Sequence, residues 1–189
     1  MRRLIAAAFA VVFLGGWALA LDLEGVSMPD TTSVSGTQLV LNGLGVRIKK
    51  VAFLKIKIYV AGLYLPAKTQ DADAALAADT PKQLVMHFLY KEVGKDKLLE
   101  AWQEGLAANA AEKVAGLADR IEKFNACWSD MRAGERAVLT YLPGSGTHVE
   151  IRGQEVGVIP GFDFAQAIFS VWLGPKPPNA ELKAGLLGR

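Results

Sequence analysis

The sequence predicts one α+β domain in which an antiparallel sheet packs against helices. Three kinds of pattern follow one another along the chain: strand-rich residues 25–66, helical periodicity over residues 95–124, and hairpin-like segments over residues 135–159. A last helical stretch closes the chain. Because strands and helices come mainly in separate runs, their order favours an antiparallel sheet over a parallel βαβ winding.

The first run predicts strands. A short strand is expected at residues 37–41, and Asn42-Gly43 after it is typical of a turn. Residues 46–65 are rich in β-branched and aromatic side chains. Within them, aliphatic and polar side chains alternate: Leu54, Ile56, Ile58 and Val60 against Lys55, Lys57 and Tyr59. This period of two predicts a half-buried strand with one polar face.

The middle of the chain predicts a change from strand to helix. Residues 71–78 form a short alanine-rich helix in this prediction, and residues 82–90 form a strand. From Lys95 the period becomes helical, with an apolar stripe of Leu98, Leu99, Trp102 and Leu106. A second helix extends the stripe to Phe124.

The last third predicts hairpins and closing helices. Turns are expected at residues 143–146 and 152–153, where glycines cluster. Helices are expected at residues 162–173 and 179–187, and Asn179 is a suitable N-cap for the second.

Residues 1–20 have the pattern of a cleavable signal peptide. Arg2 and Arg3 precede an apolar run over residues 4–17, and Ala18-Leu19-Ala20 supplies small residues for cleavage after Ala20. The run is shorter than the roughly 20 apolar residues that span a bilayer, so cleavage is favoured over a permanent anchor. Residues 21–189 are then one exported domain, periplasmic or secreted.

The charge of that domain is balanced. The chain has 21 Lys+Arg and 19 Asp+Glu; the leader holds two arginines and no acid, so 19 of each sign remain. This balance gives no electrostatic reason to expect nucleic acid or anionic lipid as a partner, and no membrane insertion is expected after cleavage. Cys127, the only cysteine, cannot close an intramolecular disulfide.

Most catalytic patterns are absent from the sequence. His87 and His148, the two histidines, have no second ligand at metal-binding spacing, so no metal site is predicted. There is no G-x-S-x-G motif, no complete dinucleotide fingerprint and no P-loop, so no cofactor is predicted either. The residues alone do not indicate an enzyme.

Arg47 is the most informative candidate residue. It follows Gly43-Leu44-Gly45 and shares a strand face with Lys49 by alternation. One interpretation is a solvated strand arginine. The other is a cleft in which the guanidinium holds an oxyanion through paired donors. Tyr59 and Tyr64 are candidates to line the same region, or to belong to the core.

Four segments of the chain, taken together, match one known pattern. The longest has a glycine-rich turn, an arginine and a long strand that ends in Gly62-Leu63-Tyr64-Leu65. The segments are residues 45–65, 98–105 (LLEAWQEG), 141–147 (YLPGSGT) and 169–174 (FSVWLG). Together they resemble the chalcone isomerase family, in particular its bacterial, exported branch.

This resemblance implies the chalcone isomerase fold: an open-faced β-sandwich with a large antiparallel sheet, a covering layer of helices and a ligand cleft between them. In members that are enzymes, an arginine stabilises a substrate oxyanion while a chalcone closes to a flavanone, and Arg47 falls on that position. The family's strand threonine falls on Tyr59. Its helical Tyr and Asn fall near Gly94 and Ala101, and its late Thr or Ser falls at Val171.

Three hypotheses follow. In the leading one, the domain binds a fatty acid or similar amphipathic carboxylate in a cleft with Arg47, Tyr59 and Tyr64. In the second, it is an intramolecular lyase of the chalcone isomerase type, with Arg47 and Tyr59 as catalytic residues. In the third, it is a non-catalytic periplasmic protein that binds a protein partner, which the sequence does not identify.

Overall fold

The computed structural model describes residues 20–189. Of the predicted signal peptide, residues 1–19 lie outside the described residues, and Ala20 begins the first strand. Two clusters of buried side chains, one on each face of the main sheet, are built from residues 26–187.

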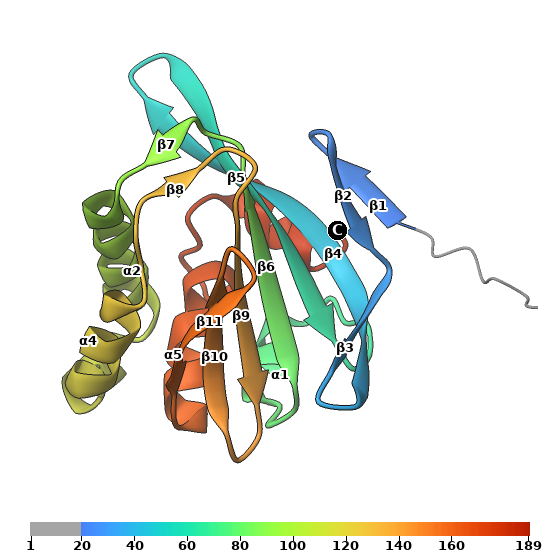
Figure 1. The fold of residues 1–189 in the computed structure, drawn as a ribbon, viewed down its shortest axis with the longest axis vertical. Coiled ribbons are helices and arrows are strands. Elements are labelled where there is room, and N and C mark those ends of the chain that lie inside the picture. The colour runs from blue at the N-terminus through green and yellow to red at the C-terminus, as the bar shows by residue number, and fades with distance from the viewer. Residues whose placement is uncertain (1–19) are drawn as a thin grey trace, which may run out of the picture.

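The main sheet has seven strands, and each paired neighbour is antiparallel (Figure 1). In spatial order it runs β11-β10-β9-β6-β5-β4-β3. The strands are β3 (Thr31–Val34), β4 (Thr37–Val51), β5 (Leu54–Leu65), β6 (Lys82–Phe88), β9 (Arg136–Leu142), β10 (Gly146–Ile151) and β11 (Gln154–Ile159). Two short pairs complete the strands: β1 (Ala20–Leu23) with β2 (Val26–Pro29), and β7 (Glu92–Val93) with β8 (Met131–Arg132).

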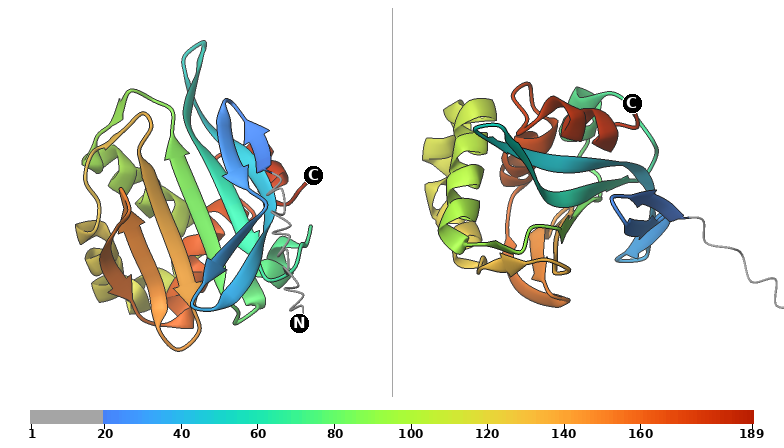
Figure 2. Two further views of the ribbon diagram at one scale, coloured as in Figure 1. Left: turned by 45° about the vertical axis from the view of Figure 1, so that its right-hand side comes forward. Right: turned by 90° about the horizontal axis from the view of Figure 1, so that it is seen from above.

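Helices gather on one face of this sheet, as Figure 2 shows from two further sides. The helical elements are α1 (Ala72–Ala77), α2 (Lys95–Asn109), α3 (Ala111–Val114), the 3-10 turn η1 (Ala115–Leu117), α4 (Ala118–Ala126), α5 (Phe162–Leu173) and α6 (Ala180–Leu186). The larger cluster of buried side chains lies between sheet and helices and includes Phe124, Phe164 and Trp172. The predicted α+β class with an antiparallel sheet is therefore confirmed.

The smaller cluster lies on the other face of the sheet, beneath the β1–β2 hairpin. Val26 and Met28 of β2 pack there with Val60 and Tyr64 of β5. Because side chains alternate along a strand, Tyr59 and Val60 belong to different clusters. The alternation in β5 thus fixes which side chains face the helices.

The turn expected at Asn42-Gly43 is wrong, because β4 runs through both residues with a register shift between Leu41 and Gly43. The Asn42 side chain is buried and takes the place of a backbone partner: its amide donates to the carbonyls of Thr69 and Leu186, and its oxygen accepts from the Thr69 N–H. The chain reverses instead after Val51, at Ala52 and Phe53.

The alternation over residues 54–60 does not produce a half-buried strand along its whole length. Strand β6 pairs with β5 only from Tyr59 onward, so residues 48–57 pair only with each other and extend beyond the sheet (the cyan hairpin of Figure 1). The register also shifts between Arg47 and Ile48, where Ile58 is the extra residue. Such a bulge reverses the facing of the side chains beyond it.

Asn179 does precede α6, as expected, but its side chain makes no capping hydrogen bond to the helix backbone. Its oxygen accepts from the backbone N–H of Ile48 at 3.1 Å, and its amide donates to the carbonyl of Val46 at 3.0 Å. Asn179 therefore attaches the start of α6 to β4, next to Arg47.

Candidate functional site

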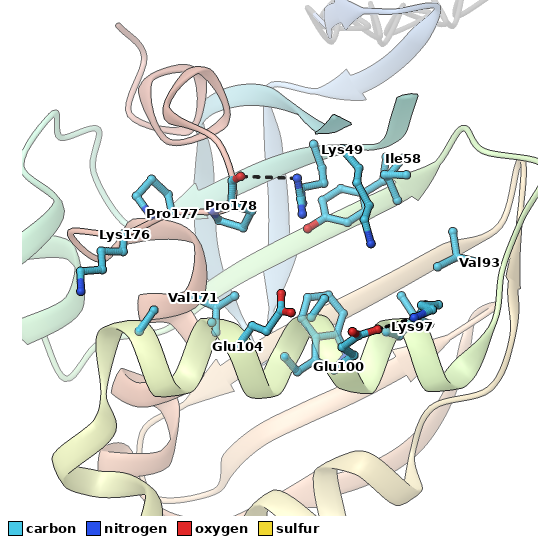
Figure 3. Close-up of a pocket in the computed structure, with 17 residues that line it drawn as sticks. Lys49, Ile58, Val93, Lys97, Glu100, Glu104, Val171, Lys176, Pro177 and Pro178 are labelled. Carbon is cyan, nitrogen blue, oxygen red and sulfur yellow. Dashed lines mark hydrogen bonds and ion pairs between the residues drawn. The ribbon is translucent and has the colours of Figure 1, made fainter. Parts of the chain in front are cut away.

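A cavity of about 300 Å³ opens between the β4–β5 strands, helix α2 and the segment that joins α5 to α6. Its floor is made of buried side chains: Tyr59, Leu98, Trp102 and Val171. Its other lining residues are Arg47, Lys49, Ile58, Val93, Lys97, Glu100, Ala101, Glu104, Gly105, Ala108, Lys176, Pro177 and Pro178. Figure 3 shows this arrangement, with Glu104 extending from α2 toward the strands and Glu100 joined to Lys97 by a dashed line.

The strand register brings Arg47 to the cavity. Arg47 pairs with Tyr59 across β4 and β5, and Tyr59 pairs with Phe88 across β5 and β6. Directly paired residues lie on the same face of a sheet, and this face looks toward the helices. The sequence therefore placed Arg47 correctly on the face of Lys49, which also lines the cavity.

The Arg47 guanidinium is only partly used by the protein. Its Nη1 donates to the carbonyls of Ile48 and Pro178, the latter at 3.4 Å (the dashed line to Pro178 in Figure 3). Within residues 20–189, no carboxylate lies at ion-pair distance from it. Because guanidinium carries five N–H donors, others remain for a ligand.

Tyr59 lies beside Arg47 and is held from the opposite side. Its hydroxyl accepts a hydrogen bond from the indole Nε1 of Trp172 at 2.9 Å, and its ring meets Phe88 edge-on at 5.5 Å. Burial raises the pKa of Tyr59 to about 12, against the lowering effects of the Trp172 hydrogen bond and the Arg47 charge. The hydroxyl is therefore protonated at neutral pH, and its hydrogen has no acceptor among the described side chains and backbone.

The charged residues around the cavity are mostly basic. Arg47, Lys49, Lys97 and Lys176 stand against Glu100 and Glu104. Lys97 and Glu100 form an exposed ion pair at 2.6 Å, which satisfies one charge of each sign. The excess of positive charge favours an anionic group at this entrance.

Trp102 forms the aromatic part of the floor, which the sequence predicted only as core. Its ring centroid is 5.1 Å from that of Trp128 and 5.2 Å from that of Trp172. Its indole Nε1 is buried without a hydrogen-bond partner in the described part of the chain. The helical stripe through Leu98 and Trp102 was the available signal, but it does not distinguish a packed core from a cavity wall.

Tyr64 is not brought to this cavity. It lies five residues from Tyr59, hence on the other face of β5, where it is buried in the smaller cluster. Its hydroxyl donates to the carbonyl of Pro29 at 2.9 Å. Tyr64 is therefore not part of the candidate site.

Two of the three positions singled out by the family resemblance contribute apolar surface to the cavity. These are Ala101 and Val171; Ser170, the residue before Val171, is buried and donates to the Ala167 carbonyl at 2.7 Å. Gly94 is the N-cap of α2 and does not line the cavity. The strands thus supply three hydrogen-bonding side chains to it: Arg47, Lys49 and Tyr59.

A second polar group lies apart from the cavity, on the β9–β10–β11 hairpins. The Ser145 hydroxyl is 2.8 Å from Nε2 of His148, and Nδ1 of His148 is 2.6 Å from a Glu155 carboxylate oxygen. The three have the order of a nucleophile, base and acid, but Ser145 and Glu155 are exposed and none of the three lines the cavity. Nucleophilic catalysis also requires oxyanion donors and a substrate pocket, so we assign no chemistry to them.

Two further features are absent from the described residues. Residues 20–189 contain no group of three or more His, Cys, Asp or Glu side chains arranged to hold a metal ion. None of the helices in this part of the chain is both long and apolar enough to cross a membrane.

Comparisons with known proteins agree with this architecture. The family model described as chalcone isomerase-like matches residues 20–188. Among solved structures, the fold is similar to the crystal structure of a fatty-acid binding protein (AtFAP1) of Arabidopsis thaliana, with a TM-score of 0.73 and 17% sequence identity. That match covers 89% of this chain and 96% of the other. No curated protein matches the sequence.

Proposed function

The chain belongs to the chalcone isomerase-like family, and we propose that it binds a fatty acid or a similar amphipathic carboxylate in the cavity beside Arg47. One observation carries this proposal. A guanidinium without a carboxylate partner among the described residues stands next to a floor of buried apolar side chains. A molecule with an anionic head and an apolar body complements both features.

In the proposed complex, Arg47 and Tyr59 hold the carboxylate together. The guanidinium donates paired hydrogen bonds, and the protonated Tyr59 hydroxyl donates one more while it accepts from Trp172. The alkyl chain covers Leu98, Trp102 and Val171, which line the floor. At about 300 Å³ the cavity is at the small end of the ~300–1,000 Å³ range of ligand sites, which favours medium-chain acids over long ones.

The structural neighbour supports the choice of probe. It is described as a fatty-acid binding protein. Since an identity of 17% extends to the fold alone, fatty-acid binding by the present chain rests on its own cavity and charges.

The cavity favours binding over ring closure. In the resemblance described above, enzymes of the family use polar side chains at helical positions that here are near Gly94, Ala101 and Val171. These residues cannot hydrogen-bond through their side chains. A partner-binding role without a ligand is the remaining hypothesis, and the same experiment tests it.

The experiment measures binding of a series of saturated fatty acids to residues 20–189, which contain both buried clusters. Arg47→Met is compared with Arg136→Met, a strand arginine that pairs with His87 away from this cavity. We expect loss of the charge-assisted hydrogen bonds to weaken binding about tenfold or more in Arg47→Met only. Chalcone absorbance is followed in parallel.

Three results would contradict the proposal. Chalcone turnover that depends on Arg47 would favour the lyase hypothesis. Absence of both binding and turnover would leave the partner-binding hypothesis. Equal weakening by Arg136→Met would place the ligand elsewhere.

We also propose that the domain is exported and acts in the periplasm or outside the cell, after cleavage following Ala20. The support is the composition of residues 1–20 and the start of the family match at residue 20. Mass spectrometry of the exported protein should give Leu21 as its first residue. Recovery of the uncleaved chain in the membrane fraction would contradict cleavage.

A further inference from the structure

The β4–β5 hairpin carries an apolar tip that the domain itself does not cover. We call residues 48–57 the arm; they pair with each other and extend beyond the sheet. At the tip, the relative exposure is 46% for Val51, 102% for Phe53 and 67% for Leu54. Val51 and Leu54 are directly paired, and Phe53 lies in the turn between them, so three exposed apolar side chains gather at the tip. Such a surface on a soluble domain typically marks an interaction site.

Basic side chains surround this tip. Lys49, Lys50, Lys55 and Lys57 are all in the arm, and the sequence has no acidic residue between Asp30 and Asp71. Lys50 and Lys55 are directly paired across the two strands. Like charges in that position repel each other, and an anion bound between them would relieve the repulsion.

Acidic groups from neighbouring elements neutralise only part of this charge. Glu24 pairs with Lys57 at 2.6 Å. Glu181 of α6 lies near Lys50 and Lys55, and Glu100 of α2 lies near Lys49. A groove between the arm and α6 is lined by Arg47, Lys49, Lys50 and Lys55 with Glu181 as its one acid among the residues that line it. The arm is therefore basic although the charge of the domain as a whole is balanced.

We propose that the arm docks on the surface of a bilayer that contains anionic lipid. Phe53 and Leu54 enter the boundary between headgroups and acyl chains, while Lys50 and Lys55 contact the headgroup phosphates. Aromatic and aliphatic side chains flanked by lysines are the composition of interfacial anchors. A second copy of this chain fits the tip less well, because pairing two arms would bring their lysines together.

The arm also joins the bilayer to the candidate site. Its base continues into Arg47 and Ile58, which line the cavity together with Lys49 of the arm. A docked arm holds the cavity entrance near the membrane, from which a fatty acid can be taken up. That transfer rests on the proposed function, whereas docking rests on the arm alone.

The test is co-sedimentation of residues 20–189 with vesicles of phosphatidylcholine, with and without phosphatidylglycerol. The fragment of residues 20–189 omits the apolar leader, which would bind vesicles by itself. The control for Phe53→Ser is Val156→Ser. Val156 is an exposed apolar side chain on β11, with a relative exposure of 44%. Lys50→Glu with Lys55→Glu is matched by Lys123→Glu, which is exposed on α4, away from the arm (Figure 1).

We expect binding to the anionic vesicles, weakened by salt. Phe53→Ser should lower the partition coefficient about tenfold, and the double lysine variant should lower it at least about tenfold. Neither control should change it. The double variant should still bind soluble fatty acid, because Lys50 and Lys55 do not line the cavity.

Three outcomes would overturn docking. The first is absence of binding to both kinds of vesicle, and the second is equal binding to both. The third is a dimer in solution that Phe53→Ser dissociates while vesicle binding stays unchanged, since a second copy would then cover the tip. If the wild-type domain docks on vesicles but does not bind fatty acid, only the proposed function is rejected.

Discussion

Tyr59 forms part of the cavity floor and also connects the sheet to α5 through a hydrogen bond. Its hydroxyl accepts from the buried Trp172 indole, so Tyr59→Phe would leave that N–H without a partner. An unsatisfied buried donor costs about 1–3 kcal/mol. We expect a decrease of that size in the free energy of unfolding, measured by urea denaturation.

The control for this substitution is Tyr90→Phe, because Tyr90 is 38% exposed and loses only contact with solvent. A double-mutant cycle of Tyr59→Phe with Trp172→Phe should show coupling, since the two side chains share one hydrogen bond. If Tyr59→Phe and Tyr90→Phe change the free energy of unfolding equally, the Tyr59–Trp172 hydrogen bond does not stabilise the domain as predicted.

Lys82 is a buried base at the start of β6. Its Nζ donates to the carbonyls of Ala75 and Ala78 at 2.7 and 2.8 Å, near the end of α1. Burial lowers the pKa of Lys82 from 10.5 to about 8, with the nearby Asp79 charge acting in the opposite direction. Between pH 8 and 10.5 the unfolded chain therefore binds more protons at this side chain than the folded chain.

Stability rises with pH where the unfolded state binds more protons. Relative to Lys82→Met, the wild-type domain should thus gain up to about 2 kcal/mol between pH 8 and pH 10. Tyr59 and Tyr141, whose pKa values are raised to about 12, lower stability above pH 10 but are common to both proteins. A constant difference in unfolding free energy across this range would refute the prediction.

The sequence located the residues of the site unevenly. Alternation placed Arg47 and Lys49 on one strand face, and both line the cavity. The same rule separates Tyr59 from Tyr64, five residues later, yet both were candidates because the identity of the buried face was unknown. Trp102 and the Pro177-Pro178 segment could not be found, since their approach to β4 depends on tertiary packing.

At the level of elements, α6 lies unusually close to β4. A Cβ added at Gly185 would overlap the carbonyl oxygen of Leu44, and one added at Gly45 would overlap that of Leu182. These glycines let the helix rest directly on the strand backbone. The close approach also holds Asn179 and Pro178 beside Arg47.

Gly185→Ala should therefore push α6 away from β4. We expect a loss of about 1–3 kcal/mol or more, the usual cost of overpacking. Gly116→Ala is the matched control, because a Cβ there would meet no atom within 4 Å. The urea midpoints of the two variants check this, and an unchanged midpoint for Gly185→Ala would contradict the close contact.

The sequence predicted the kinds of element better than their connections. The helical stripe of α2 and the glycine turns of the β9–β10–β11 hairpins are in place. The turn predicted at Asn42-Gly43 was wrong because these residue types also serve other purposes. Here Asn42 supplies a buried side-chain amide, and Gly43 allows α6 to approach the strand closely. The sequence also did not predict the exposed arm. Alternation shows that the two faces of a strand differ, but it does not show whether other elements of the fold cover one of them.

For the whole molecule, local arrangement matters more than totals. The balanced charge of residues 21–189 gave no reason to expect an anionic partner, yet the cavity entrance and the arm are both mostly basic. The family resemblance, confirmed over residues 20–188, predicted the sheet and its helical cover. It did not predict that the basic arm would continue into the cavity entrance, which follows from the register of β4 and β5.

The most direct measurement compares the affinities of one fatty acid and the alcohol of equal chain length for the wild-type domain and for Arg47→Met. The alcohol retains the alkyl chain but not the charge, so it also controls for packing changes around Ile48 and Pro178. Wild type should prefer the acid by about tenfold or more, and Arg47→Met should lose most of that preference, with unchanged affinity for the alcohol. An undiminished preference for the acid in Arg47→Met would contradict the proposal that Arg47 holds the carboxylate.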